Sequence, residues 1–179
     1  MAVGKVSPET ATECTIAGEP ERSRFLEIYD SHARSVYRYL LSRLGDPAEA
    51  QDLTSQTILT AWEHFPRYRD NGRAGAWLMA IARSRLVDFL RREQRRPEEF
   101  FFPEEGVGAV FEESERRSRL QEEVRRLPDS DRELLRLRYT AGMPVAEIAA
   151  LFGRSEEAVK KSLQRLIGRL RSRMEVEHE

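Results

Sequence analysis

Two stretches of the sequence are rich in side chains that bind phosphate groups. Residues 154–173 hold seven Lys or Arg against two Glu, and residues 83–96 hold six Arg against two acids. The segment between them, residues 97–115, has seven Glu and no basic residue. The net charge of −1 hides this segregation. Two basic stretches joined by an acidic one predict two nucleic-acid contacts on one molecule.

The sequence offers no arrangement of residues for catalysis. His32, His64 and His178 are isolated, and there is no HxxxH or HExxH spacing, glycine-rich phosphate loop or Gly-x-Ser-x-Gly turn. Cys14 is the only cysteine, so one chain can form neither a disulfide nor a thiolate metal cluster. We therefore expect no enzyme activity, no catalytic residue, no metal and no cofactor.

A helix-turn-helix pattern positions the C-terminal basic stretch. In residues 144–171, PVAEIAALFGRSEEAVKKSLQRLIGRLR, apolar residues recur at helical steps on both sides of Gly153, which supplies the turn, and Ser155 caps the second helix. The predicted inward residues are Val145, Ile148, Ala149, Phe152, Ala158, Val159, Leu163, Leu166 and Leu170.

The outward residues of the second helix form the predicted recognition face, which meets base edges in the major groove and nearby phosphates. Its members are Arg154, Ser155, Glu157, Lys160, Lys161, Gln164, Arg165 and Arg169. The alternative is an amphipathic hairpin with an ordinary solvated face. A generic face mixes signs, whereas residues 160–171 contain five bases and no acid.

The rest of the chain predicts an all-α fold of two small helical domains. Leu, Ala, Arg and Glu dominate, and 34% of the residues are charged. We assign residues 1–20 to a disordered tail, 21–96 to the first domain, 97–114 to a flexible acidic linker and 115–174 to the second domain. The linker carries Phe100, Phe101, Phe102 and Phe111, which either pack on a domain or dock on a partner.

Apolar periodicity and capping signals place the remaining helices. In the first domain we expect one helix from Glu21 to Gly45, a second from a capping box at Asp46 and Glu49 to Pro66, and a third over residues 74–95. In the second domain we expect a helix over residues 115–127 and another from a capping box at Ser130 and Glu133. Expected inward residues include Phe25, Tyr29, Val36, Leu40, Leu53, Trp77, Leu78, Ile81, Leu86 and Val87.

Three strings resemble regions 2 and 4 of the extracytoplasmic-function sigma factors of the sigma-70 family. They are AEAQDLTSQTILTAW (residues 48–62), GAWLMAIARSRLVDFLRR (75–92) and LPDSDRELLRLRYTAGMPVAEIAALFGRSEEAVKKSLQRLIGRLR (127–171). The resemblance implies a factor that binds core RNA polymerase and directs initiation at promoters in response to a stress or signal. The competing interpretation is an autonomous helix-turn-helix regulator, which would bind an operator tightly without the polymerase.

The resemblance also implies roles for residues of the first domain. Asp52, Ser55 and Gln56 would bind the clamp helices of the largest polymerase subunit. The minus-ten element would be melted and its single strand held by Tyr68, Asn71, Gly72, Arg73, Trp77, Arg83, Arg85 and Arg91. Trp77 has a second interpretation, because with Ile81 one turn later it fits a core position. The second domain would read the minus-thirty-five element.

Five positions depart from the usual family pattern. Gln51 and Gln56 stand where Glu is typical, and Ser55 where Gln is typical, so we expect a weaker or differently balanced polymerase contact. Ala74 replaces a phenylalanine and Ser84 an asparagine, which leaves the minus-ten preference open.

The resemblance further implies an anti-sigma factor, often bound to the membrane, as a partner. We expect the chain itself to be cytoplasmic without membrane insertion, because its longest apolar run covers only residues 76–82. An extended 18-residue linker spans at most about 60 Å. Promoter elements about 17 base pairs apart are separated by roughly 58 Å, so one chain can reach both.

Overall fold

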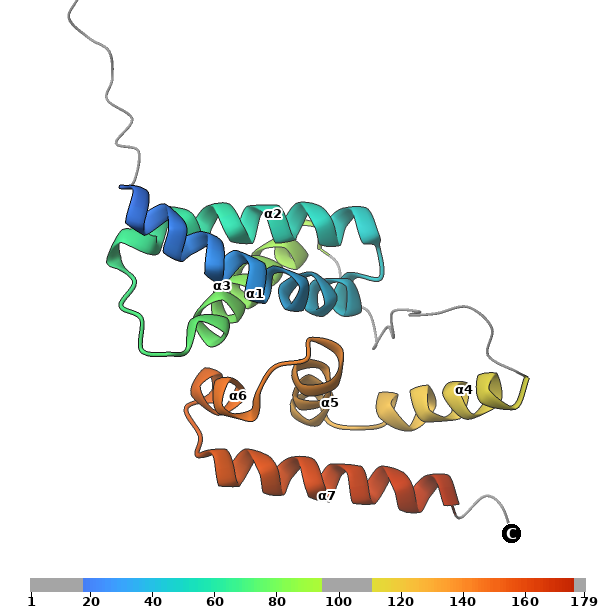
Figure 1. Cartoon of the computed structure of the whole chain (residues 1–179). Helices are drawn as coiled ribbons and strands as arrows, with labels where there is room; N and C mark the ends of the chain where they lie inside the picture. Colours follow the sequence, from blue (N-terminus) through green and yellow to red (C-terminus); the bar gives the residue numbers. More distant parts are fainter. Residues whose placement is uncertain (1–17, 95–110, 176–179) are drawn as a thin grey trace, which may run out of the picture.

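The computed structural model describes residues 18–94 and 111–175, and these contain helices but no strand (Figure 1). The first domain consists of α1 (Glu19–Leu44), α2 (Pro47–His64), the 3-10 turn η1 (Phe65–Arg67) and α3 (Ala74–Arg92). The second consists of α4 (Phe111–Arg125), α5 (Asp129–Leu135), the π-helical turn η2 (Arg136–Thr140), α6 (Val145–Phe152) and α7 (Glu156–Glu175). The all-α prediction is confirmed.

Several helix boundaries differ from the sequence expectation. Helix α1 starts before Glu21, α3 ends before residue 95, and α4 begins at Phe111, inside the segment assigned to the linker. The expected tail up to residue 17 and the linker residues up to 110, with Phe100, Phe101 and Phe102, lie outside the described residues.

Local capping chemistry explains where several helices begin and end. Asp46 Oδ1 accepts a hydrogen bond from the Glu49 backbone N–H at 2.8 Å, with Pro47 in the first turn. Ser155 Oγ accepts one from the Ala158 N–H at 3.2 Å. Gly153 ends α6 at φ +61°, a left-handed conformation that favours glycine. The turn between the two helices of the helix-turn-helix therefore forms as predicted.

The buried stripes correct the expected inward sets at two positions. Tyr29 is 42% exposed and Val87 is 62% exposed, so neither belongs to the core. Ile28 and Tyr39 are buried in α1 instead. The buried stripe of α3 runs through Leu78, Ala82, Leu86 and Leu90 in steps of four, and Val87 falls beside it.

The predicted capping box at Ser130 and Glu133 is wrong. Helix α5 begins after Pro128, and no side chain caps its N-terminus. Glu133 is only 7% exposed and turns toward the first domain, where it contacts Tyr39 and Arg43. The local pattern predicted that the Glu133 side chain caps its own helix, but this side chain binds residues of the first domain instead.

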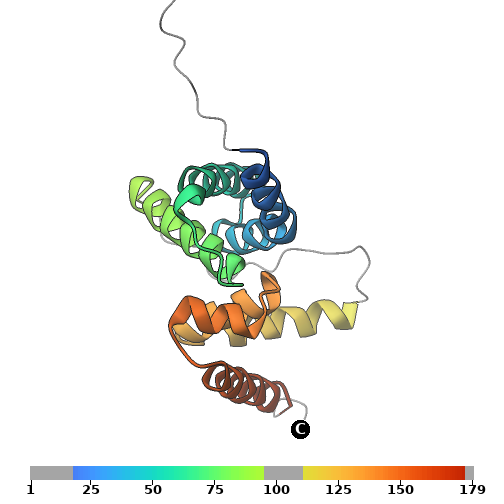
Figure 2. The same cartoon turned by 60° about the vertical axis from the view of Figure 1, so that its left-hand side comes forward.

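The two domains pack against each other through α1 against η2 and α3 against α6. Figures 1 and 2 show α5 and α6 lying between the first domain and α7, which forms the outermost layer. One apolar cluster runs through both domains, whereas a second one, with Val124, Leu127, Leu135, Leu166 and Leu170, lies in the second domain alone.

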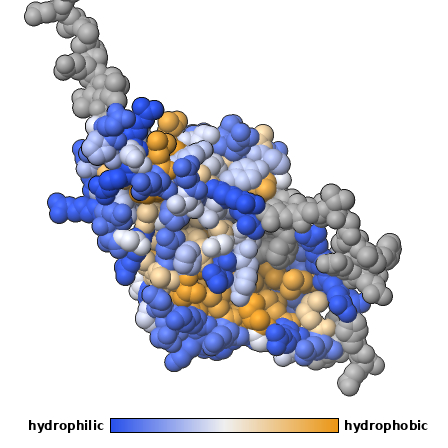
Figure 3. Space-filling model, viewed as in Figure 1, coloured by the Kyte–Doolittle hydropathy of each residue, from blue (hydrophilic) through white to orange (hydrophobic). Residues whose placement is uncertain are grey.

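The two domains differ on the face shown in Figure 3, where apolar residues gather between the level of α5 and α6 and that of α7. The first domain is mostly hydrophilic in the same view. Within residues 18–94 and 111–175, no helix combines the length and apolar character needed to cross a membrane.

Candidate nucleic-acid and polymerase interfaces

The recognition face of α7 is exposed to solvent along its length. Val159, Leu163 and Leu166 are buried beneath it, which turns the residues between them outward. The exposed members include Glu157, Lys160, Lys161, Gln164, Arg165 and Arg169, with Arg154 and Ser155 just before the helix. The structure thus brings the whole predicted set onto one surface, as the helical period required.

The cations of this face are held by short-range contacts. Lys160 Nζ lies 3.4 Å from Glu157 Oε1, and Arg165 Nε donates to the Lys161 carbonyl at 3.3 Å. Arg154 Nη2 donates to Ser162 Oγ at 2.8 Å. Exposed pairs of this kind contribute little to stability, so the cations can exchange these partners for DNA at small cost.

The C-terminal part of α7 is braced by neighbouring helices. Arg169 Nη2 lies 2.7 Å from Asp131 Oδ2 of α5, and Arg173 Nη1 lies 3.1 Å from Glu123 Oε2 of α4. These two acids were not among the predicted site residues. Their link to α7 joins residues 38 and 50 positions apart, which no helical period reveals.

The loop before α3 is ordered around Asp70. Its Oδ1 accepts hydrogen bonds from the Gly72 N–H at 2.9 Å and from Tyr68 Oη at 3.3 Å. Burial and the nearby Asp70 carboxylate raise the pKa of Tyr68 above its ordinary value. Gly72 has φ +72°, and its neighbours Asn71 and Arg73 are exposed. The loop therefore presents these groups to solvent from a fixed turn.

Tyr68 and Trp77 stack on one another with ring centroids 4.2 Å apart. Trp77 is half-buried and packs against the apolar core near Phe65. Phe65 in turn contacts Phe25. Packing against the apolar core therefore explains the position of Trp77. The Tyr68 ring lies on one face of the Trp77 ring.

The three arginines predicted on α3 point to different partners. Arg85 Nη2 donates to Thr60 Oγ1 of α2 at 2.7 Å, and Arg91 Nη2 lies 3.0 Å from Asp88 Oδ1. Arg83 instead contacts the second domain, with Nε 3.1 Å from Glu133 Oε1. The structure does not gather these arginines into one surface.

A groove of about 460 Å³ between α2 and α3 unites part of the predicted set. We call it the α2–α3 groove, and it is lined by Thr60, His64, Trp77, Ile81, Ser84, Arg85 and Asp88. Thr60 and His64 were not among the predicted site residues, although their spacing of four places them on one helix face.

The predicted polymerase-binding residues share one solvent face of α2. Asp52, Ser55 and Gln56 are exposed, and Leu53 and Thr57 are buried on the opposite side. Leu59, which is 62% exposed, continues this face by one turn and was not predicted. Leu59 falls on the polar side of the helical period, so the sequence itself indicated an exposed leucine at this position.

Comparison with known proteins places both domains in one family. Residues 28–96 match Sigma-70 region 2, and residues 117–170 match Sigma-70, region 4. The ECF RNA polymerase sigma factor ShbA of Streptomyces griseus is 30% identical over 151 residues, covering 75% of this chain and 79% of that protein. The chain belongs to the ECF RNA polymerase sigma factors. It is a non-enzymatic factor that directs transcription initiation by RNA polymerase.

Other relatives support the same family. The ECF sigma factor BldN of Streptomyces coelicolor is 36% identical over 152 residues, 78% of this chain. This sigma factor covers 56% of BldN, so it spans little more than half of that relative. The solved complex of the sigma factor RpoE with the anti-sigma factor NepR from Bartonella quintana has a TM-score of 0.57 and 18% identity, covering 87% of this chain and 96% of that one, and shows the same fold.

Two departures of this sigma factor from the usual family pattern lie near the first-domain sites. Ser84 is exposed and lines the α2–α3 groove, whereas Ala74 is half-buried at the start of α3. Both positions therefore carry small side chains.

Proposed function

We propose that this sigma factor binds core polymerase through the exposed face of α2 and holds two promoter elements with its two domains. The observation that carries the proposal is the recognition face of α7. It is fully solvent-facing, has five bases and no acid between residues 160 and 171, and lies on a helix-turn-helix.

The second domain reads the minus-thirty-five element in the major groove. Lys160, Gln164 and Arg165 project from the N-terminal half of α7, where a recognition helix meets base edges. Arg169 and Arg173, braced from α5 and α4, bind the flanking phosphates. Phosphate contacts fix the register, and base contacts supply the choice of sequence.

The first domain holds the single strand of the minus-ten element. Asn71, Gly72 and Arg73 form the rim of a pocket for a flipped base, beside the stacked Tyr68 and Trp77. Arg85 of the α2–α3 groove, together with Arg83 and Arg91, binds the strand's phosphates. Tyr68 supplies the aromatic face next to this pocket.

Asp52 is the charged contact to the clamp helices of the largest polymerase subunit, with Ser55 and Gln56 beside it. The departures at Gln51 and Gln56 leave fewer acids on this face than the family pattern has. Lost rim charges chiefly slow association and reduce its dependence on salt.

An anti-sigma factor is the proposed regulator in the cytoplasm, since the similar RpoE is bound to NepR. Such a partner would deliver the stress or signal that releases this sigma factor, and a membrane-bound one would hold it at the membrane. Co-purification from the source cells tests for it, and a chain that elutes only with polymerase contradicts this part of the proposal.

Run-off transcription with purified core polymerase tests the proposed function. Core alone is compared with core plus this protein on a fragmented genomic library. We expect discrete new start sites that require the protein, and their alignment gives both promoter elements. The double variant Lys160→Ala, Arg165→Ala should lose these starts. Arg125→Ala on α4, whose side chain contacts Glu122 of the same helix, is the matched control. Starts unaffected by the double variant would remove α7 from promoter reading.

A further inference from the structure

A cavity of about 780 Å³ lies between the two domains. Its walls come mainly from α1 and α3 of the first domain and from α5, η2 and α6 of the second. Sites for small molecules often fall at domain boundaries and have volumes of about 300–1,000 Å³. We call this space the interdomain cavity, and its volume suits one small organic ligand.

The interdomain cavity carries an excess of positive charge. Five arginines and two acids line it, which leaves three positive charges in excess. Arginine matches phosphate well, because its planar fork of N–H donors can bind two oxygens at once. The lining therefore favours a ligand with several phosphate groups. The arginines are Arg43, Arg83, Arg132, Arg136 and Arg154, and the acids are Asp129 and Glu133.

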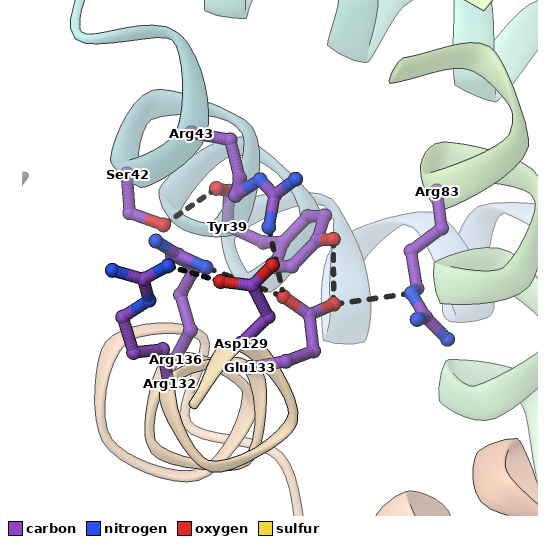
Figure 4. A network of polar contacts seen from close by, with 8 residues as sticks. All are labelled: Tyr39, Ser42, Arg43, Arg83, Asp129, Arg132, Glu133 and Arg136. Atoms are coloured by element: carbon purple, nitrogen blue, oxygen red, sulfur yellow. Dashed lines mark hydrogen bonds and ion pairs between the residues drawn. The ribbon is translucent and has the colours of Figure 1, made fainter. Parts of the chain in front are cut away.

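Glu133 contacts three of these arginines and fixes their positions. Its carboxylate lies 3.2 Å from Arg43 Nη1, 3.1 Å from Arg83 Nε and 3.3 Å from Arg136 Nη1 (Figure 4). It also accepts a hydrogen bond from Tyr39 Oη at 2.8 Å. One negative charge is thus shared among three guanidinium groups. Donors that are already held in place lose less conformational freedom when a ligand binds.

The pKa values of two lining residues reflect the same positive potential. Burial and then the neighbouring Arg43 charge lower the pKa of Arg136 to about 10, so this guanidinium stays protonated at neutral pH. The hydrogen bond and charge of Arg132 lower the pKa of the exposed Asp129 most, and the charges of Arg43 and Arg136 lower it further. A ligand anion among these groups is stabilised by the same charges.

The Nε–H of Arg43 is a further donor at this wall. The Nε atom is shielded from solvent, and no residue within 18–94 or 111–175 accepts a hydrogen bond from it. A buried donor without an acceptor is destabilising. Rotation of the side chain turns this N–H toward the cavity that Arg43 lines. A phosphate oxygen there would supply the acceptor.

A second part of the cavity wall is apolar. Leu86 and Val87 of α3 and Phe152 of α6 form it. Val87 is 62% exposed, so it presents apolar surface next to the buried Leu86. The Arg83 guanidinium carbon lies 5.3 Å from the centroid of the Phe152 ring. Apolar side chains and guanidinium planes both pack on flat rings. This part of the wall therefore suits a heteroaromatic base.

We propose that the interdomain cavity binds a nucleoside polyphosphate. Its phosphates contact the arginines of α1, α5 and η2, and its base packs against the apolar residues of α3 and α6. Because both domains supply the walls, the ligand binds their packed arrangement best, and its concentration shifts the population of that arrangement. The proposal does not use the roles of α2, α3 and α7 in transcription, so it can fail without the proposed function failing.

Calorimetric titration of the full chain with ATP, without added Mg²⁺, tests the site. We expect saturable binding of one ATP per chain and no saturable binding of adenosine, which lacks the phosphates. Arg43→Gln together with Arg132→Gln should weaken ATP binding about tenfold or more, because hydrogen bonds to a charged group are lost. Absence of saturable ATP binding to the wild type overturns the proposal.

Arg22→Gln together with Arg117→Gln is the matched control. It removes the same charge from exposed positions on α1 and α4, one in each domain. The affinity for ATP should stay as in the wild type, and circular dichroism checks that both double variants are folded. An equal loss of affinity in the control would show non-specific attraction of ATP and refute the site.

Val87→Trp tests the base-binding part in a variant that keeps every arginine. Val87 is exposed, so the fold should tolerate the larger side chain, which then fills the apolar part of the cavity. We expect ATP to bind about tenfold more weakly, because the base loses its apolar contacts. Tripolyphosphate should bind as it does to the wild type. Unchanged affinity for ATP contradicts a nucleoside ligand.

A DNA strand carries the same phosphate chemistry and is the alternative source. The Arg136 side chain is only 3% exposed, which favours a terminal phosphate over a continuous backbone. Fluorescence anisotropy of a labelled single strand distinguishes the two. The variant with Arg43→Gln and Arg132→Gln should bind the strand as the wild type does, since neither residue is a proposed DNA contact. A loss of strand binding equal to the loss of ATP binding would assign these arginines to nucleic acid and overturn the proposal.

Discussion

The cations of α3 and those of α7 are held in different ways. On α7, Lys160 and Arg165 interact within their own helix, and their side chains stay exposed. On α3, Arg83 and Arg85 contact residues of α5 and α2. One surface is open in the free chain, and the other is engaged with the rest of the molecule. Two basic helices of similar composition therefore differ in availability because of their tertiary partners.

We expect the strongest loss of stability from truncating a buried side chain beneath α7. Leu166 is fully buried in the apolar cluster of the second domain. Leu166→Ala should lower the free energy of unfolding by about 2–5 kcal/mol and release the second domain first. Urea unfolding followed by circular dichroism measures the change. Leu59→Ala, at an exposed position on α2, is the control and should change stability by less than about 0.5 kcal/mol.

Arg165→Ala tests whether the exposed face of α7 reads bases. Truncating a residue that reads a base should weaken binding to the minus-thirty-five element by about 1–3 kcal/mol and relax its sequence choice. Competition binding of holoenzyme to promoters altered base by base measures this. If all sequences weaken equally, Arg165 holds a phosphate instead.

Asp52→Arg tests the exposed face of α2, which is proposed to bind core polymerase. Asp52 is exposed on α2, so the fold should persist while a like-charge contact replaces an attractive one. We expect affinity for core polymerase to fall about tenfold or more, mostly through slower association. Surface plasmon resonance at two salt concentrations measures it, and normal affinity at both would rule out this contact.

Thr60→Val should change stability only slightly, and it tests the contact that Arg85 of α3 makes with α2. Thr60 Oγ1 accepts the hydrogen bond of Arg85, and valine keeps the shape without the acceptor. Stability should fall by about 0.5–1.5 kcal/mol. Arg85 is then free, so single-strand binding should tighten slightly. Thermal unfolding and fluorescence anisotropy give both values, and weaker binding would show that Thr60 orients Arg85 for the strand.

Helical periodicity and caps predicted much of this fold. Gly153, Ser155 and the buried row of α7 follow from spacing alone, because a helix-turn-helix is a local structure. The recognition face follows from the same row. Helix ends were less accurate, as at Phe111, because fraying and capping leave only short-range signals.

Contacts between distant residues could not be predicted from one sequence. Glu133 fits a capping box three residues after Ser130, yet its carboxylate meets Tyr39 and Arg43 some 90 positions earlier. The α2–α3 groove similarly needs the packing of two helices before Thr60 and Arg85 become neighbours. The periodicity of the sequence determines which face of a helix is polar. The packing of distant elements then determines which polar side chains remain exposed to solvent.

The apolar cluster shared by both domains makes the contact sensitive to temperature. Leu134 and Met143 of the second domain belong to the same buried cluster as Val36 and Met79 of the first. Parting the domains hydrates some of this surface and so raises the heat capacity of the chain. Apolar association weakens on cooling. The apolar part of the interdomain contact is therefore weaker at low temperature.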